Sequence, residues 1–394
     1  MKHILLLLAL AGCVEHKPGV TGTQSIGVEL VSPASPGDKL HRLADGARTI
    51  TVNLTAYDAA FAVDTTFDRD VQVYAQFLGT LTPELGSTPA LATFHMTAGR
   101  AMAQTLMLPP VLGPTTLWVD DGADADPTYA TGASPTLWYR DPTIADLQTP
   151  PRETALDALT ASPLQNKQVT VDSSRYGANG RLVVTSVFSQ GYTVSDVQCI
   201  DAAGTPPCTA KAYDHVEVFS FSAPFDGNGN AIQEGQVIDG FAGGVSEFNG
   251  LTEIGFPVTF ATSTATTPDR RPAAVKLDPA TWFGPLSASD GIINFERNEA
   301  GAIEIDGGKV CNLDSDYVTF KQWKLDPTGT GGDCSGNRNV LNVITTGVIS
   351  DLDPATLVGK TLPRVVGILR PVEIGTFNVW IIFPRSHADL TLPQ

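Results

Sequence analysis

The strongest constraint on this sequence is a hairpin pattern that is written twice in its C-terminal half. The segment EGQVIDGFAGGVSEFNGLTEI reads as two strands joined by an Asn-Gly turn, and VGKTLPRVVGILRPVEIGTFNVWI repeats the arrangement. Gly235 and Gly243 have the same spacing as Gly359 and Gly367. Glycine permits a bulge or a close backbone approach where a strand curls sharply. We therefore predict that each copy is the closing hairpin of a small barrel, and that the barrel is duplicated.

Each hairpin ends a run of candidate strands. The first run reads RLVVTSVF, YTVSDVQ, HVEVFSFSAPF, QVIDGFAGGVSEF and LTEIGFPVTFA, and the second reads GAIEIDGGKV, DYVTFKQWKL, VLNVITTGV, LPRVVGILRPV and FNVWIIFPR. Five strands with an insertion between the third and the fourth is the order of the oligonucleotide/oligosaccharide-binding (OB) fold. We therefore predict two OB-type five-stranded barrels, over residues 164–264 and 288–394, with a linker over 265–287.

The N-terminal part has a different strand pattern. In TITVNLTAY apolar residues alternate with polar ones, which is the signature of a half-buried strand, and DVQVYAQFL repeats it. With GVELV, ALATFHM, AQTLML, TTLWVD and SPTLWY this gives about seven short strands. The pattern favours an immunoglobulin (Ig)-like β-sandwich over residues 23–142, so the whole chain is expected to be all-β. Residues 143–163 lose the alternation and contain prolines, which predicts a linker with one short helix at ETALDAL.

The first residues read as an export signal. MKHILLLLALAGC places Lys2 before an apolar run that is too short to span a bilayer. The run ends in Leu-Ala-Gly-Cys, which resembles a bacterial lipobox, where signal peptidase cleaves before the cysteine and the cysteine is acylated. We expect a signal peptide over residues 1–12, lipidation at Cys13, a tether over 13–22, and anchorage at the outer membrane or cell surface by lipid alone. An ordinary signal peptide is the alternative.

The other cysteines agree with export. Four cysteines follow Cys13, an even number in a compartment that permits disulfides. Of the possible pairings we expect Cys199–Cys208 and Cys311–Cys334, since each pair closes a Gly-rich or Pro-rich loop, and each closure is worth about 3 kcal/mol of loop entropy. Neither pair has the C-x-x-C spacing of a redox site or a zinc knuckle, so both are interpreted as structural.

The charge balance limits the partners. The net charge of −17 makes nucleic acid a disfavoured ligand, because phosphate backbones need clustered lysine and arginine side chains. A local basic group of Lys360, Arg364, Arg370 and Arg385 keeps nucleic-acid binding as an alternative.

Several segments resemble a known class of proteins. GRLVVTSVFSQGYTVSD, GQVIDGFAGGVSEFNGLTEI and GILRPVEIGTFNVWIIFPRSHADL resemble the tandem OB-type domains that accompany secreted bacterial nucleases and phosphatases of the endonuclease/exonuclease/phosphatase class. NFERNEAGAIEIDGGKV is similar to the segment that opens their second barrel, and the N-terminal part is similar to Ig-like regions of bacterial surface lipoproteins. Those nucleases carry their catalytic carboxylates and histidines in a separate domain that this sequence does not contain. The resemblance therefore implies binding without hydrolysis.

Motifs of catalysis are absent from the sequence. It has no G-x-S-x-G, no H-E-x-x-H, no phosphate-binding G-x-x-x-x-G-K-[ST] and no G-x-G-x-x-G before a helix. His95 and His215 lie in strand-like runs and are interpreted as packing residues. We therefore expect no enzyme and no cofactor. A buried group of acidic and imidazole side chains converging on one cleft would instead favour the alternative, a hydrolase whose carboxyl pair is assembled by the fold.

Three loops are rich in acidic side chains or amides. DGNGNAIQEG begins like an EF-hand loop but has Ala231 where that loop needs glycine, so it is interpreted as a turn. NLDSDY carries Asp314 and Asp316. Carboxylates at this density repel one another unless they are solvated or bridged by a hard cation. Weak calcium binding stays an open alternative for the loop DDGADADP, at Asp120, Asp121, Asp124 and Asp126.

The most specific binding hypothesis lies in DYVTFKQWKL. If this segment is a strand, Tyr317, Lys321 and Trp323 share one face, and Lys321 cannot point into an apolar interior. OB folds bind on the surface of strands two and three, where aromatic side chains beside a cation stack on bases or sugar rings. The alternative, which we favour, is that Tyr317 and Trp323 pack against the neighbouring barrel or the linker.

These features predict an exported, lipid-anchored protein that binds a polysaccharide, an envelope protein or an extracellular polymer without catalysis. The alternative function is a nucleic-acid-binding accessory or vestige of an extracellular nuclease system.

Overall fold

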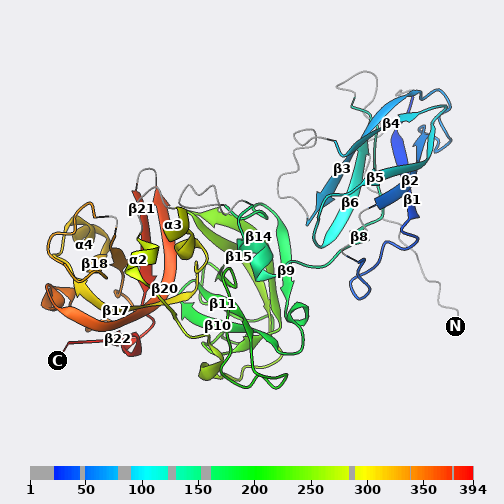
Figure 1. The fold of residues 1–394 in the computed structure, drawn as a ribbon. Coiled ribbons are helices and arrows are strands. Elements are labelled where there is room, and N and C mark those ends of the chain that lie inside the picture. Colours follow the sequence, from blue (N-terminus) through cyan, green and yellow to red (C-terminus); the bar gives the residue numbers. More distant parts are fainter. Residues whose placement is uncertain are drawn as a thin grey trace. The chain divides into compact units, whose positions relative to one another are not determined.

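The computed structural model describes residues 22–44, 49–78, 90–122, 130–151, 161–283, 289–337, 339–374 and 377–393. The described part of the chain is all-β, with 44% of the residues in strands and 10% in helices (Figure 1). It divides into a first unit, Met1–Phe77 with Pro83–Arg140, and a second unit, Leu78–Thr82 with Asp141–Gln394. The predicted signal peptide, Cys13 and the ETALDAL helix lie outside the described residues.

The first unit consists of short strands connected in the order β4-β3-β6-β7-β1-β2-β5, with β8 paired to β6. Among the described strands, the groups β1-β2-β5 and β4-β3-β6 are connected in this order by β7, which meets β1 at one residue pair. The strands are β1 (Ser25–Ser32), β2 (Thr49–Tyr57), β3 (Arg69–Phe77), β4 (Ala92–Met96), β5 (Arg100–Met107), β6 (Pro114–Asp120), β7 (Thr131–Ala133) and β8 (Leu137–Trp138).

The core of the first unit follows from the alternation in its strands. Ile50, Val52, Leu54 and Ala56 on β2 are fully buried, as the period of two predicts. They share one hydrophobic core with apolar residues from the other strand group, among them Val71, Val73, Leu117 and Val119. Two strand groups therefore enclose a single core. The sequence did not predict β7, because its three residues, Thr-Gly-Ala, carry no apolar alternation.

The second unit begins with a closed five-stranded barrel. Its strands pair in the order β10-β11-β12-β15-β14, with β12 and β15 parallel. The barrel closes because β13, which continues after one residue as β14, pairs with β10. The predicted strands are confirmed, and β9 is an additional strand on β14. The strands are β9 (Gln168–Asp172), β10 (Gly180–Phe188), β11 (Gly191–Gln198), β12 (His215–Phe219), β13 (Val237–Ile238), β14 (Gly240–Phe248) and β15 (Leu251–Phe260).

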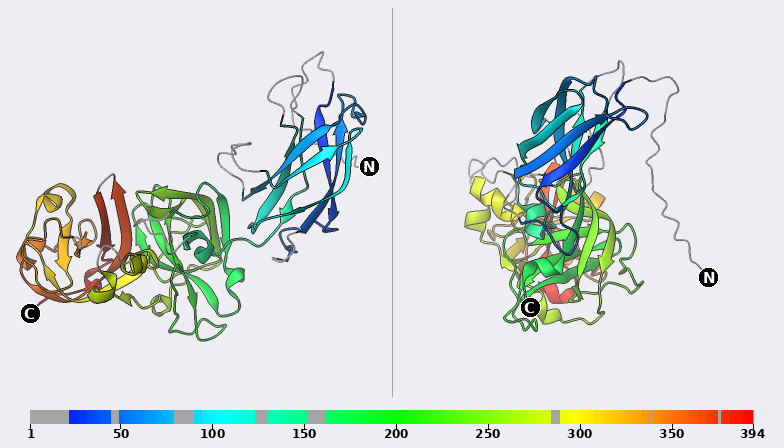
Figure 2. Two further views of the ribbon diagram at one scale, coloured as in Figure 1. Left: turned by 45° about the horizontal axis from the view of Figure 1, so that its top comes forward. Right: turned by 90° about the vertical axis from the view of Figure 1, so that its right-hand side faces the viewer.

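A second sheet repeats this order. Its strands pair as β17-β18-β19-β21-β20, β19 and β21 are parallel, and the pairing of β17 with β20 returns the sheet to its start. The two barrels lie side by side in Figure 1 and in the left view of Figure 2. The strands are β17 (Ala302–Val310), β18 (Trp323–Asp326), β19 (Leu341–Val343), β20 (Thr361–Ile374) and β21 (Phe377–Phe383), flanked by β16 (Val275–Lys276) and β22 (Leu390–Thr391).

Matching glycines occupy equivalent places in the two closing hairpins. Gly235 and Gly359 have φ angles of 74° and 75°, a region that favours glycine. At Gly243 a Cβ atom would lie 2.7 Å from the carbonyl oxygen of Gly255, and at Gly367 it would lie 2.9 Å from the backbone of Phe383. Both positions therefore require the close approach of strand four to strand five that the repeat predicted.

The helices are short, and the described parts of the segments predicted as linkers contain helices and a strand. Thr143 caps α1 (Ile144–Gln148) inside the predicted first linker, and β16 in the second linker pairs with β17. These segments therefore belong to the second unit as structured elements. The others are α2 (Pro279–Trp282), α3 (Ser289–Glu296), α4 (Ser315–Phe320) and the 3-10 turns η1 (Ser173–Tyr176), η2 (Pro268–Arg270), η3 (Pro354–Leu357) and η4 (His387–Asp389).

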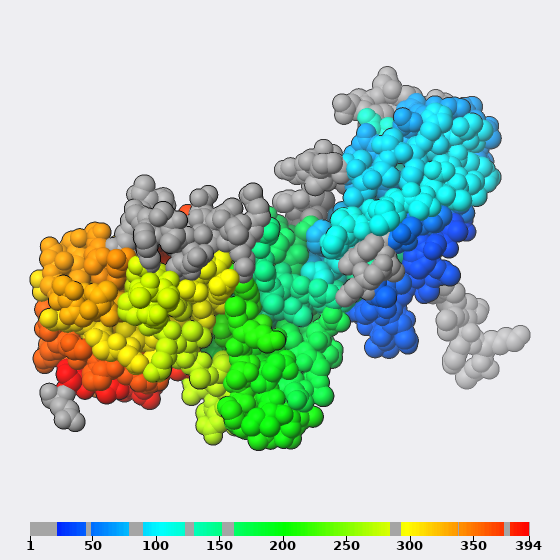
Figure 3. Space-filling view, in the orientation of Figure 1, coloured from blue at the N-terminus to red at the C-terminus, as the bar shows by residue number. Residues whose placement is uncertain are grey.

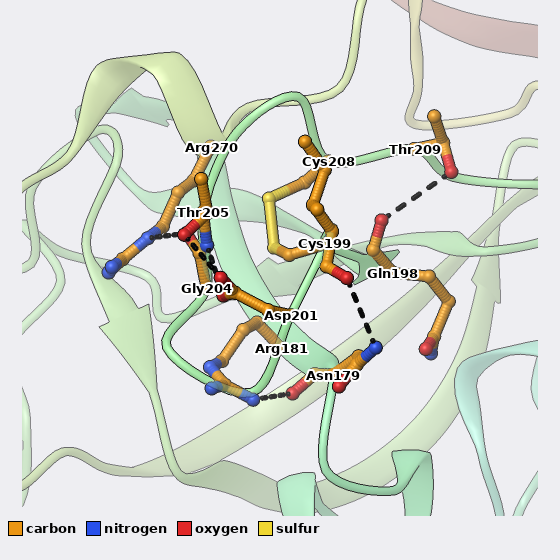
Figure 4. The surroundings of a disulfide bond; sticks show 12 residues. Asn179, Arg181, Gln198, Cys199, Asp201, Gly204, Thr205, Cys208, Thr209 and Arg270 are labelled. Carbon is orange, nitrogen blue, oxygen red and sulfur yellow. Dashed lines mark hydrogen bonds between the residues drawn. A yellow bond between two sulfur atoms is a disulfide. The ribbon is translucent and has the colours of Figure 1, made fainter.

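Both expected disulfides are present in the second unit. Cys199–Cys208 closes the loop after β11, and Cys311–Cys334 closes the loop that contains α4 and β18. Figure 4 shows how Arg270 reaches the first of these loops, where its Nε donates to the carbonyl oxygen of Gly204 at 2.7 Å. Disulfides are typical of exported proteins. Within the described residues, no helix is long and apolar enough to cross a membrane.

Candidate functional site

The prediction that Tyr317, Lys321 and Trp323 share an exposed ligand-binding face of one strand is wrong. Asp314 caps a helical turn by accepting from the backbone N–H of Asp316 at 3.0 Å, so Tyr317 lies on α4, and Lys321 ends that helix with a φ of 60°. The strand starts only at Trp323, which is 1% exposed in the core of the second barrel. Tyr317 packs against the same core. The three side chains therefore share no exposed strand face.

The acidic loops are neutralised by the protein itself where they are described. The ammonium group of Lys324 contacts the carboxylates of both Asp314 and Asp316, the latter at 2.7 Å. Asp226 accepts from two backbone N–H groups of its own turn, at Asn228 and Asn230, as a plain turn would. No group of three or more acidic, histidine or cysteine side chains in the described ranges is arranged to hold a metal ion.

The aspartate-rich loop predicted as a weak calcium site is described only in part. Asp120 and Asp121 are buried, and Asp121 lies 3.6 Å from the guanidinium group of Arg69. Asp124 and Asp126 lie outside the described residues.

The prediction that both histidines are packing residues is wrong for His95. His95 is about half exposed and lies between the carboxylates of Asp70, 2.9 Å away, and Asp68, 3.0 Å away. The hydrogen bond with Asp70 raises the pKa of His95 above its usual value. His215 is a packing residue as predicted: it is buried, and its Nδ1 lies 2.6 Å from Oγ of Ser195. Burial lowers the pKa of His215 to about 4, so its ring is neutral at pH 7.

The predicted basic group does not form an open patch. Arg364 pairs with Glu304 at 2.7 Å, Arg385 pairs with Asp389 at 2.7 Å, and Arg370 pairs with Glu217 at 2.8 Å. Lys360 is exposed. With three of the four cations already held by carboxylates, this surface offers little net positive charge to a phosphate backbone.

The outer face of β11 and β12 is polar and buried. Val216 and Val218 alternate with His215 and Glu217 on β12, so the two polar side chains point away from the interior of the first barrel. The second barrel covers them: Arg370 on β20 pairs with Glu217, and Gly301 lies directly against the ring of His215. The atoms of the two barrels adjoin in Figure 3. We call this contact between the barrels the seam.

A group of carboxyl side chains is enclosed beside the seam. Glu299 accepts from the backbone N–H of Thr252 at 3.0 Å and from Nε2 of Gln148 at 3.3 Å. Burial raises the pKa of Glu296 to about 8 and raises that of Glu299 well above its usual value. Glu247, which accepts from Oγ1 of Thr252 at 2.7 Å, adds to this effect through its charge. At neutral pH the carboxyl group of Glu296 is therefore largely protonated.

Glu217 is the most deeply buried ionisable group of the seam. It is 0% exposed, and burial raises its pKa to about 7 despite the nearby guanidinium group of Arg370. The rings of Phe188 and Phe383 hold that guanidinium group at 5.5 and 5.2 Å from their centroids. Removing one partner of a buried ion pair strongly destabilises the folded protein, because the other charge stays buried without compensation.

An exposed apolar surface lies on the first barrel, along β15 and in the loop after β12. Phe256 is 84% exposed and Phe221 is 54% exposed, and their ring centroids are 4.9 Å apart. Val258 and Phe260 follow Phe256 along β15 with their side chains exposed, while Thr259 between them is buried. Phe225 is exposed in the loop after β12, two residues before Gly227, whose backbone N–H donates to the carbonyl oxygen of Thr259. We call Phe221, Phe225, Phe256, Val258 and Phe260 the phenylalanine patch.

The backbone of the phenylalanine patch is strained. Phe221 has a φ of 60° and Phe256 a φ of 50°, which bulky side chains rarely adopt. Phe256 lies where the pairing of β14 with β15 shifts its register, between Ala242 and Gly244. Each such residue costs about 1–3 kcal/mol, and strain of this kind clusters at functional sites. The chain therefore holds two apolar rings in water at a cost in stability.

Sequence reasoning missed both the seam and the phenylalanine patch. The alternation of Phe256, Val258 and Phe260 against Thr259 was visible, but the pattern alone does not say which face lies inside the barrel. The alternation on β12 has the same ambiguity. Arg370, the partner of Glu217, lies far along the chain, so no local signal links them.

No family model, no curated protein and no solved structure matches the sequence.

Proposed function

We propose that this protein is an exported, non-catalytic binding protein, and that the phenylalanine patch holds the apolar surface of another protein. The patch carries the proposal, because contiguous exposed apolar residues mark interaction sites and aromatic side chains dominate their energetics. Its members are phenylalanine and valine, without hydroxyl or amide groups among them. A sugar ring needs such polar partners, so a protein surface is favoured over a polysaccharide. The charge of −17 favours a partner with basic residues around its apolar centre.

The architecture in this proposal is an Ig-like sandwich followed by two OB-type barrels. The sandwich is supported by the two strand groups that enclose the core of the first unit. The OB type is supported by the strand order one-two-three-five-four in both barrels, with the third and fifth strands parallel. The usual OB ligand surface on strands two and three of the first barrel is covered by the second barrel. The proposal therefore places binding on β15 instead.

Non-catalytic binding is favoured over hydrolysis and over nucleic-acid binding. The carboxyl groups of Glu296 and Glu299 are buried. A small pocket opens at the seam, and among the described residues that line it Glu217 carries the one carboxyl group. A glycosidase or similar hydrolase needs two carboxyl groups facing its substrate. The pairing of Arg364, Arg370 and Arg385 with carboxylates removes the basic surface that nucleic acid would need.

A peptide-array experiment tests the patch. The intact exported protein is probed with an array of peptides that vary in aromatic and basic content, alongside an oligosaccharide panel. We expect aromatic peptides with basic flanks to bind, and the double variant Phe221→Ser/Phe256→Ser to lose at least about tenfold in affinity, since each anchor is worth more than about 1.4 kcal/mol. The matched control is Phe61→Ser, which removes a phenylalanine that is 77% exposed and has a φ of 57°.

Three results would count against the proposal. Binding that survives in the double variant removes the patch as the site. Equal losses in the Phe61→Ser control point to nonspecific adhesion. Glycan binding through the patch, without peptide binding, keeps the binding function but contradicts the protein partner.

Lipid anchorage at Cys13 belongs to the same proposal. It is supported by the lipobox-like sequence at the N-terminus and by the disulfides, which fit an exported protein. Mass spectrometry of the mature N-terminus tests it: we expect an acylated cysteine, and an unmodified residue or an uncleaved Met1 would contradict it.

A further inference from the structure

A small pocket opens at the seam between the two barrels. It has a volume of about 80 Å³ and is lined from the first barrel by Ser186, Phe188, Thr193 and Glu217 and from the second by Arg370 and Phe383, among others. Hydroxyl, carboxyl and guanidinium groups thus face a space that two aromatic rings border. The pocket belongs to the seam and not to the phenylalanine patch.

Two buried atoms at this pocket have no partner among the described residues. Oε1 of Glu217 accepts from Nη2 of Arg370 at 2.8 Å, but Oε2 of Glu217 and Nε of Arg370 make no hydrogen bond. A buried polar atom left without a partner costs about 1–3 kcal/mol, and more when it is charged. Glu217 is 0% exposed, so bulk solvent does not satisfy it. One free acceptor and one free donor therefore belong to the same ion pair.

The guanidinium group is fixed in place. The ring centroids of Phe188 and Phe383 lie 5.5 and 5.2 Å from the guanidinium carbon of Arg370. The one hydrogen bond from Nη2 of Arg370 to Glu217 fixes the orientation of the guanidinium plane. Arginine held in this way presents its remaining N–H groups in a rigid plane. A ligand that offers both an acceptor and a donor can satisfy both of these atoms, whereas a simple ion can satisfy only one of them.

We propose that the pocket binds the acetamido group of an N-acetylated compound. Its N–H donates to Oε2 of Glu217, its carbonyl oxygen accepts from Nε of Arg370, and its methyl group packs near the phenylalanine rings. The pocket has roughly half the volume of an engineered cavity of about 150 Å³ that binds benzene, which suits a group of about four non-hydrogen atoms. The rest of the molecule extends out of the pocket. An acetamido group occurs on N-acetylated amino sugars and on acetylated lysine side chains.

Ligand-observed NMR and titration calorimetry on the intact protein test the proposal. The probes are acetamide, N-acetylglucosamine and a peptide with one acetyl-lysine, each beside its unacetylated counterpart: ammonium, glucosamine and the lysine peptide. We expect the acetylated member of at least one pair to bind, and its counterpart to bind at least about tenfold more weakly, the ratio for one lost buried hydrogen bond. The pair with the greater affinity identifies the source.

Variants tie the binding to the pocket. Glu217→Gln replaces the free acceptor with a donor and is expected to lower the affinity at least about tenfold. The matched control is Glu304→Gln, which changes another glutamate paired with an arginine, Arg364, outside the pocket. The variant Phe221→Ser/Phe256→Ser is expected to keep acetamido binding, so a failure of the proposed function and a failure of this inference are distinguishable.

A measurement on the unmodified protein covers the case in which Glu217→Gln fails to fold. With a labelled acetyl methyl group, we expect nuclear Overhauser contacts to the ring protons of Phe188 and Phe383. Water as the only occupant, acetylated and unacetylated probes binding alike, or methyl contacts elsewhere on the protein would each overturn the proposal.

Discussion

At the scale of single residues, Gly243 illustrates how a side chain that is absent determines a fold. A Cβ atom there would lie 2.6 Å from Cγ2 of Ile254 and 2.7 Å from the carbonyl oxygen of Gly255. The second contact is with backbone, so it cannot be relieved by a rotamer change. The sequence predicted this position correctly, because glycine spacing is a local signal with a direct steric meaning.

Gly243→Ala should destabilise the second unit by about 1–3 kcal/mol, the usual range for overpacking in a closed site. Gly255→Ala is the matched control on the neighbouring strand, because its nearest non-neighbouring atom lies 3.9 Å from the Cβ position. Urea unfolding of both variants measures the difference. Equal stability of the two would contradict the steric argument.

The second prediction at this scale concerns the titration of His95. Its hydrogen bonds with Asp70 and Asp68 hold its pKa above the usual value of 6.5. Asp70→Asn should lower that pKa, since Asp70 is the first cause of the shift. NMR of the ring protons across pH 5–9 measures it, with Asp38→Asn, beside His41, as the control that should leave His95 unchanged. An unaltered pKa in Asp70→Asn would show that the pair does not form in solution.

At the scale of elements, alternation predicted strands well and their environment poorly. It placed β2 and its buried face correctly, because Ile50, Val52, Leu54 and Ala56 form a regular series. It failed at α4, where Asp314 provides a helix cap that outweighs the pattern of the residues after it. Alternation also did not reveal that His215 and Glu217 on β12 are buried, since residues of the second barrel pack over them. Periodicity reports the two faces of a strand, not what lies against them.

Buried carboxyl groups of the first barrel and α3 make the free energy of unfolding of the second unit fall as the pH rises. Burial raises the pKa of Glu217 to about 7 and that of Glu296 to about 8, above the value near 4.5 expected in the unfolded chain. The folded state therefore binds more protons, and its stability falls as pH rises from about 4.5 through 8. Glu217 alone should contribute a loss on the order of 3 kcal/mol between pH 5 and pH 8.

Glu217→Gln separates this effect from other titrations. The variant has no proton to lose at this position, so its free energy of unfolding should depend less steeply on pH than that of the unmodified protein. Chemical unfolding at pH 5, 6.5 and 8 measures both slopes. Parallel slopes would mean that Glu217 titrates with an ordinary pKa.

At the scale of the whole molecule, the two units differ in their covalent constraints. Both disulfides lie in the second unit, and the described part of the first unit has a hydrophobic core without a disulfide. The sequence predicted the pairing because each bond closes a short loop. It did not predict that two barrels would form one compact unit, since the residues that join them carry no local signal.

Reduction should therefore affect the two units differently. In the chain-entropy model each bond contributes about 3 kcal/mol, so loss of both should lower the melting temperature of the second unit by on the order of 10 °C. Calorimetry with and without a phosphine reductant measures this, and the transition of the first unit serves as the internal control. A shift of both transitions would contradict the assignment of the bonds to one unit.

The two barrels share an architecture but present different exteriors. On β15 the rings of Phe256 and Phe260 face solvent, whereas on β21, the fifth strand of the second barrel, Trp380 stacks on Phe295 with centroids 5.4 Å apart. With two barrels of the same architecture, one barrel can present an exposed apolar surface while the corresponding strand of the other packs against its own chain. Among related sequences we therefore expect exposed positions of the second barrel outside the seam to vary more than exposed positions of β15 on the first barrel.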